Sequence, residues 1–174
     1  MSNLIIAYPT ISNSDYSWIQ SIREKSDPRY FEVAKPHVTL VFGTEKLTTK
    51  ELITYTKGKL ANLRKVELKL DSAIVVEDDT KTFFHAFLVP STGYDEVVSI
   101  HDLLYTDDLA SELREDIPFI PHIGIGTSDN KDEMVALVNE INDIKKVIVG
   151  SLEKVTIVQY DGVKVSDIEN IPLG

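Results

Sequence analysis

The chain has 174 residues, enough for one domain or for two small lobes that share a core, and its 43% hydrophobic and 26% charged residues are ordinary globular proportions. Its formal net charge of −10 and isoelectric point of about 4.8 disfavour the capture of long duplex nucleic acid. It has no cysteine and four histidines, so disulfides, thiolate nucleophiles and cysteine-ligated metals are excluded, and catalysis would have to use histidine, carboxylate or hydroxyl groups.

The N-terminus has no basic segment, and its apolar run, residues 4–9, is too short for the core of a signal peptide or for a membrane span. We therefore expect a cytoplasmic protein without a membrane partner. We also expect no metal and no cofactor. The sequence does not indicate an oligomeric state.

Strands and helices are predicted to alternate through the first half of the chain. The expected elements are a strand over 4–8, a short helix capped by Ser14 or Asp15, a strand over 35–42, and a helix that begins at the capping box Thr48-x-x-Glu51.

The second half follows the same pattern. Two strands over 66–70 and 83–89 should form a long hairpin around an acidic turn. The later elements are a helix over 94–113 with an interruption at 105–107, a strand over 118–126, a helix capped by Asp129, and strands over 152–160 and 163–171.

The two halves carry the same dipeptide at equivalent places. Pro36-His37 and Pro121-His122 each open a predicted strand, and they lie 85 positions apart, about half the chain length. This period predicts one two-lobed domain over 1–174. The expected class is α+β, a duplicated domain with mostly antiparallel sheets lining a central cleft and helices outside.

Side chains two positions apart on a strand share a face, so His37 and Thr39 should project together, about 6.6 Å apart along the strand. His122 and Gly124 should share a face in the other half. If the halves pack about a pseudo-two-fold axis, both imidazoles face one cleft. Such a pair suits phosphodiester chemistry, because one neutral imidazole accepts a proton from the nucleophile while one imidazolium protonates the leaving oxygen.

These residues resemble the 2H phosphoesterase superfamily, which includes the 2′-5′ RNA ligase-like proteins and the cyclic nucleotide phosphodiesterases and is marked by two His-x-Thr/Ser strands in a duplicated fold. Residues 36–43 are similar to the first motif in full, residues 119–126 to the second except at one position, and residues 155–173 to the closing hairpin. The resemblance covers nearly the whole chain.

The resemblance implies metal-independent opening of a 2′,3′-cyclic phosphate, or cleavage or joining of 2′-5′ linkages in nucleotides or at RNA ends. It implies that His37 and His122 are the catalytic acid/base pair and that Thr39 binds phosphate. Which histidine is the base stays open, since the roles exchange with reaction direction.

Gly124 stands where the superfamily has Thr or Ser, so one phosphate-binding hydroxyl is absent. Loss of such a donor costs roughly 10²- to 10³-fold in rate. Ser128 shares the nominal face but lies six residues on, and Thr127 is expected to have the wrong parity. The alternative prediction is therefore a catalytically weakened nucleotide-binding protein.

Other residues are assigned no catalytic role. His85 is predicted to be a half-buried packing residue, and His101 to lie on a helix surface. Tyr8, Phe42 and Tyr160 are candidates for stacking a base, with core packing as the competing interpretation.

Overall fold

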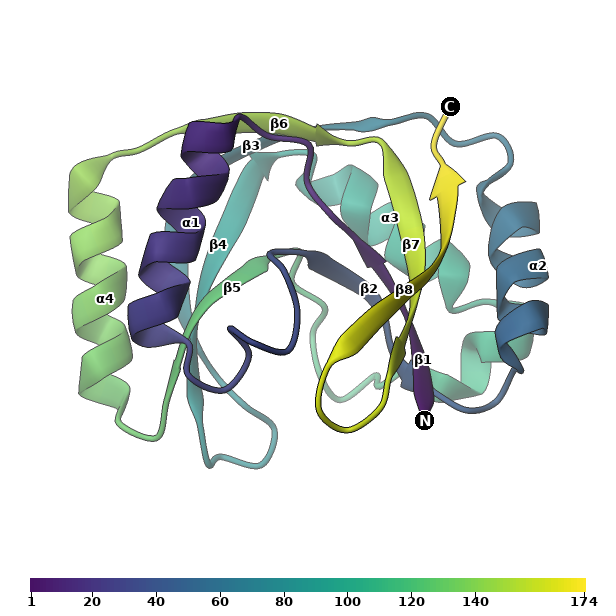
Figure 1. Ribbon diagram of the computed structural model, residues 1–174, viewed down its shortest axis with the longest axis horizontal. Coiled ribbons are helices and arrows are strands. Elements are labelled where there is room, and N and C mark those ends of the chain that lie inside the picture. The colour runs from purple at the N-terminus through teal and green to yellow at the C-terminus, as the bar shows by residue number, and fades with distance from the viewer.

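The computed structural model describes all residues, 1–174, and contains two four-stranded antiparallel sheets flanked by helices (Figure 1). The strands of the first sheet, in the order β2-β1-β7-β8, are Val38–Thr44, Ser2–Ala7, Lys154–Tyr160 and Val165–Pro172. The strands of the second sheet, in the order β5-β4-β3-β6, are Ile123–Ser128, Phe84–Thr92, Val66–Glu77 and Ile148–Leu152. The predicted α+β class is confirmed.

The helices are α1 (Asn13–Ser26), α2 (Thr49–Leu60), α3 (Tyr94–Leu104), the short 3-10 helix η1 (Asp107–Glu112) and α4 (Lys131–Ile144). The element order is therefore strand, helix, strand, helix, strand from β1 to β3, and the same again from β4 to β6. The hairpin β7–β8 closes the chain. The duplicated order expected from the two Pro-His pairs is present.

Each half places its first helix on the other half's sheet. Helix α1 follows β1 of the first sheet but packs against β5 of the second, whereas α3 follows β4 of the second sheet and packs against β2 of the first while it also contacts β3 and β4. Figure 1 shows α1 beside α4 over one sheet, and α2 and α3 at the opposite end of the molecule. This exchange ties the two lobes together.

Local signals predict most helix boundaries closely. The capping box is formed, since the Thr48 side chain accepts from the backbone of Glu51 and the Glu51 carboxylate accepts from the backbone of Thr48. Two predicted caps are wrong: Ser12 caps α1 and Asn130 caps α4. In both cases a neighbouring polar side chain competes for the same role.

One strand, β6, is absent from the prediction. The expected strand over 152–160 is β7, which begins at Lys154, whereas β6 ends at Leu152, where the chain leaves the second sheet before it joins the first after Glu153. Both strands are apolar, so hydrophobic patterning alone does not reveal the change of sheet. Strand β3 also runs on to Glu77, well past the predicted end.

The two motif strands carry a β-bulge at equivalent positions. In β2 the neighbours of Leu40 pair with consecutive residues of β1, and in β5 the neighbours of Ile125 pair with consecutive residues of β4. Leu40 and Ile125 are again 85 positions apart, and both are fully buried in the core. The duplication therefore extends to backbone irregularities.

No helix is both long and apolar enough to cross a membrane.

Candidate active site

His37 and His122 are held in the same way. Each lies one residue before its strand, and each ring Nδ1 is hydrogen-bonded to the backbone carbonyl two residues earlier, that of Lys35 at 2.7 Å and that of Ile120 at 2.6 Å. These carbonyls bond to the rings instead of to a neighbouring strand. The strands therefore begin at Val38 and Ile123, later than the predicted starts.

The hydrogen bonds determine the tautomer of each ring. A carbonyl oxygen only accepts, so Nδ1 of each imidazole carries the hydrogen, and Nε2 is the atom that gains or loses a proton. Neither Nε2 has a hydrogen-bond partner within the protein. Both halves thus present the same titrating atom, free to contact a ligand.

Burial lowers the pKa of both rings. The pKa of His122 is lowered to about 4, mainly by burial and further by the positive charges of His37 and His85, against the Ile120 carbonyl, which favours the charged ring. Burial likewise lowers the pKa of His37, against the Lys35 carbonyl. His37 is among the charges that lower the pKa of His122, so the two motifs lie within electrostatic reach of each other.

The segment leading into His37 is fastened by a buried ion pair. Arg23 of α1 donates to the Asp27 carboxylate at 3.3 Å and to the carbonyls of Tyr30 at 3.0 Å and Ala34 at 2.9 Å. Arg23 and Asp27 are each only 2% exposed. The guanidinium therefore fixes the course of the chain toward the first motif.

The segment leading into His122 is fastened by α3. His101 is 4% exposed, and its ring stacks on Phe119 with centroids 3.7 Å apart. The prediction that His101 lies on the helix surface is wrong, because the face of α3 that carries it packs against this segment. Each motif is thus anchored by the first helix of its half.

The two motifs differ at the second position. Thr39 pairs with Ile6 of β1, is half-buried, and has no hydrogen bond from its hydroxyl to the protein. Gly124 is the equivalent residue, and a Cβ built on it meets no atom within 4 Å. The missing side chain therefore leaves open space that no other group fills.

The bulge at Ile125 corrects the predicted orientation of Thr127. In β5, Gly124 pairs with Phe87 and Thr127 pairs with His85, and these two partners lie on one face of β4. The extra residue shifts the alternation by one, so Thr127 belongs to the face of Gly124. Its hydroxyl is not available to a ligand, since Thr127 is 5% exposed and donates to Asp27 at 3.0 Å.

A series of rings follows the inner face of the second sheet from His122. The centroids of His122 and Phe87 are 3.5 Å apart, those of Phe87 and His85 5.6 Å, and those of His85 and Tyr30 6.3 Å. His85 is half-buried, as predicted, but it extends the site electrostatically. The sequence offers no signal for this, because β4 meets the second motif only through sheet pairing.

Of the aromatic candidates for base stacking, only Tyr8 contacts the ring of a motif histidine. Its ring meets that of His37 edge-on at 6.5 Å, and its hydroxyl donates to Asp167 at 2.7 Å.

No group of three or more His, Cys, Asp or Glu side chains is arranged to hold a metal ion.

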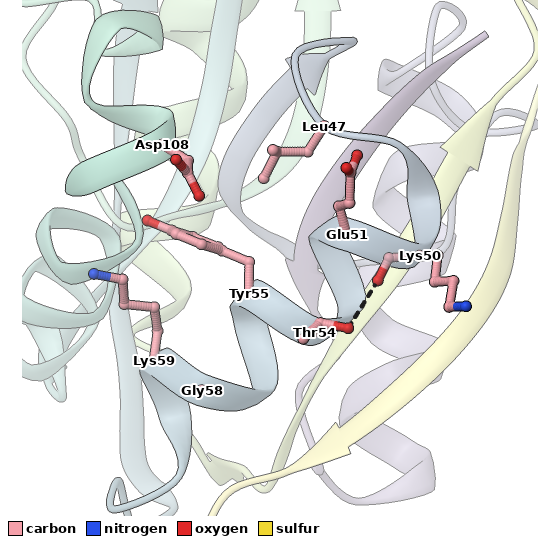
Figure 2. A pocket seen from close by; sticks show the side chains of 8 residues that line it. All are labelled: Leu47, Lys50, Glu51, Thr54, Tyr55, Gly58, Lys59 and Asp108. Carbon is pink, nitrogen blue, oxygen red and sulfur yellow. Dashed lines mark hydrogen bonds between the residues drawn. The ribbon is translucent and has the colours of Figure 1, made fainter.

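One hollow of the molecule lies away from the histidines. It has a volume of about 790 Å³ and lies beside α2 and η1, as Figure 2 shows. Both lysines that line this hollow have carboxylates beside them. Lys59 forms a salt bridge with Asp107, and Lys50 lies on the same rim as Glu51. This hollow has no arrangement suited to acid/base chemistry.

Comparisons with known proteins identify the family and the fold. The sequence profile of the family described as the 2′-5′ RNA ligase superfamily matches residues 11–164. A comparison with curated proteins finds no match.

Several solved structures share the fold over almost the full chain. TT0787 of Thermus thermophilus has a TM-score of 0.62 at 14% identity, covering 99% of this chain and 98% of that one. Escherichia coli LigT complexed with 3′-AMP has a TM-score of 0.60 at 12% identity, covering 99% of this chain and 97% of that one. Kluyveromyces marxianus Usb1 has a TM-score of 0.59 at 11% identity, covering 98% of this chain and 97% of that one. At such identities the likeness is one of fold.

Proposed function

The chain belongs to the 2′-5′ RNA ligase superfamily, and from that premise we propose that it is a metal-independent phosphodiesterase that acts on 2′,3′-cyclic phosphates or 2′-5′ linkages of nucleotides or RNA ends. The observation that carries the proposal is the matched pair of imidazoles, each with Nδ1 bonded to a carbonyl and Nε2 free. The likeness to LigT, whose structure holds 3′-AMP, supports a nucleotide ligand.

Opening of a 2′,3′-cyclic phosphate then proceeds by one proton transfer at each histidine. A neutral Nε2 takes a proton from water as its oxygen forms a bond to phosphorus, and the Nε2–H of the other, charged ring protonates the departing 3′ oxygen as its bond to phosphorus breaks. The product is a 2′-phosphate with a free 3′ hydroxyl. In the reverse direction His37 and His122 exchange roles.

Thr39 supplies the remaining interaction with the phosphate. Its free hydroxyl donates to a non-bridging oxygen, where negative charge grows in the transition state. The rings themselves resist protonation until the anion arrives, because burial lowers both pKa values and a bound phosphate raises them. Substrate binding thus generates the charged acid that the reaction needs.

The open space at Gly124 favours a second candidate function. With one hydroxyl absent, the protein would bind a nucleotide through the same groups and turn it over slowly or not at all. This candidate differs from the first in rate, not in ligand.

The test is incubation with 2′,3′-cyclic mononucleotides in the presence of EDTA, with products separated by chromatography. We expect a 2′-phosphate, and we expect His37→Ala and His122→Ala each to lower the rate by roughly 10²- to 10⁴-fold. Melting curves of both variants check that they fold. Binding without product would select the second candidate, and loss of activity with EDTA alone would contradict the mechanism.

A further inference from the structure

Beyond the histidine pair, the inner face of the second sheet ends in a cluster of polar and aromatic groups. Tyr30, on the loop after α1, lies 6.3 Å from the ring of His85, and Arg29 lies 5.4 Å from the ring of Tyr30 and 4.2 Å from that of Phe83. Through Phe87 this cluster is continuous with His122. It therefore extends the site from His122.

Arg29 is an unpaired cation in a strongly acidic protein. Its side chain is exposed, it forms no salt bridge, and the aromatic contacts hold its guanidinium beside a hollow of about 370 Å³. The hollow is also lined by Lys25, Asp129 and Glu133. A guanidinium held in this way is prepared for bidentate binding of a phosphate.

Two of the carboxylates near Arg29 are already engaged. Asp27 accepts hydrogen bonds from Arg23 and Thr127. Asp78 accepts from Thr80, and from the backbone amides of residues 82 and 83, within its own turn. Neither carboxylate forms a salt bridge with Arg29.

Two further polar atoms are free beside Arg29. The hydroxyl of Tyr30, which is 40% exposed, has no hydrogen bond within the protein. Nδ1 of His85 lies 3.4 Å from the Thr127 hydroxyl, whose own hydrogen goes to Asp27, so Nδ1–H donates to Thr127 and Nε2 is left as a free acceptor.

We propose that Arg29, Tyr30 and His85 form a subsite for a second nucleotide, so that the substrate is an RNA end of at least two nucleotides. Arg29 and the Tyr30 hydroxyl bind the neighbouring phosphodiester. Nε2 of His85 accepts a hydrogen bond from the 2′ hydroxyl of this second nucleotide, because the 2′ and 3′ oxygens of the terminal ribose are both part of the cyclic phosphate. The inference rests on the proposed function, because it assumes that the reacting phosphate lies at His37 and His122.

The kinetic test compares a 2′,3′-cyclic mononucleotide with a dinucleotide that ends in the same cyclic phosphate. We expect kcat/KM to be about 10- to 100-fold higher for the dinucleotide, the effect of a charge-assisted contact. Arg29→Gln should remove this preference and leave mononucleotide turnover unchanged. Arg64→Gln, which removes an exposed guanidinium after α2, is the matched control and should change neither substrate.

A binding measurement separates failure of the subsite from failure of the proposed function. Calorimetry would compare a dinucleotide that ends in a 2′-phosphate with the nucleoside 2′-phosphate alone. Tighter binding of the dinucleotide that Arg29→Gln abolishes would support the subsite even without turnover. Equal affinity of the two ligands, with or without turnover, would overturn it.

Discussion

Gly124 is the residue at which the two halves of the site differ most. A Cβ at this position meets no atom within 4 Å, so a side chain can start here without a clash at its first atom. In a strand, a β-branched residue is also favoured over glycine. The second motif can therefore be completed by one substitution.

We expect Gly124→Thr to raise kcat by roughly 10²-fold, because a second hydroxyl would donate to the phosphate in the transition state. Gly124→Val is the matched control, since valine has the shape of threonine without the hydroxyl. Steady-state kinetics on a 2′,3′-cyclic nucleotide gives the comparison. Equal rates for the two variants would show that the hydroxyl is not what the motif lacks.

The lowered pKa values of the histidines lead to a prediction about pH. Activity needs one neutral and one charged imidazole, and in the free protein the pKa of His122 is about 4 while that of His37 is lowered from 6.5. The rate rises with pH as the base loses its proton and falls as the acid loses its own. We therefore expect kcat/KM to be bell-shaped with its maximum below pH 6.5, whichever ring is the base.

The measurement is kcat/KM between about pH 3 and about pH 8, a range that extends below the lowered pKa of His122 and above the ordinary pKa of histidine. Because a bound phosphate anion raises both pKa values, the kcat profile should have its maximum at higher pH than the kcat/KM profile. A kcat/KM maximum at or above neutral pH would show that the rings are not desolvated in the free protein.

Histidines in two matching motifs are recognisable from the sequence as a pair. Thr127 is not placed correctly by sequence reasoning, because strict alternation fails at a bulge, and the bulge at Ile125 shows only in the pairing with β4. His85 and Arg29 are likewise outside prediction, since no spacing in the sequence relates them to His122. Residues that belong to a sequence motif can be predicted from the sequence. Residues that join a site only because the fold brings them next to it cannot.

At the scale of elements, α1 joins the two lobes through one buried carboxylate. Asp27, directly after α1, binds Arg23 of the same helix and the hydroxyl of Thr127 on β5. A charge pair this deeply buried is costly to break from one side, because the remaining charge stays without a partner. The junction therefore depends on Asp27 as much as on apolar packing.

We expect Asp27→Asn to lower the free energy of unfolding by about 3 kcal/mol, because Arg23 would be left buried without a counter-ion. Asp143→Asn, which removes an exposed carboxylate from α4, should have an effect within about 0.5 kcal/mol. Urea denaturation of the two variants beside the unaltered protein measures both values. A loss below about 1 kcal/mol at Asp27 would mean that water solvates Arg23 in its place.

Local chemistry makes most elements predictable. The capping box at Thr48 needs only two residues three positions apart, and the hairpin β3–β4 needs only alternation around a polar turn. The division at Glu153 needs knowledge of which sheet each strand joins, and that depends on the whole chain.

At the scale of the molecule, the exchanged helices make each lobe depend on the other. Helix α1 covers β5 and α3 covers β2, so neither sheet keeps its full core if the other half unfolds. The buried core forms one continuous cluster that includes residues of both sheets. We therefore expect the protein to unfold as one cooperative unit.

The fluorescence of Trp18, the only tryptophan, reports whether α1 stays packed on the core, because Trp18 lies on α1 and packs against that core. Its fluorescence and the far-ultraviolet circular dichroism should follow the same transition in urea, with equal midpoints and slopes. An earlier fluorescence transition would show that α1 detaches from β5 while the sheets remain folded.

The α+β class, the repeated order of elements and the pair of Pro-His motifs are predictable from the amino-acid sequence, because each depends on periodicity or on residue types at short spacing. The exchange of the first helices, the inward turn of Thr127 and the position of Arg29, Tyr30 and His85 beside the site are visible only in the folded molecule. These features arise from strand pairing and packing between segments far apart in the chain. Such contacts are selected by the burial of the whole core, and no local pattern encodes them.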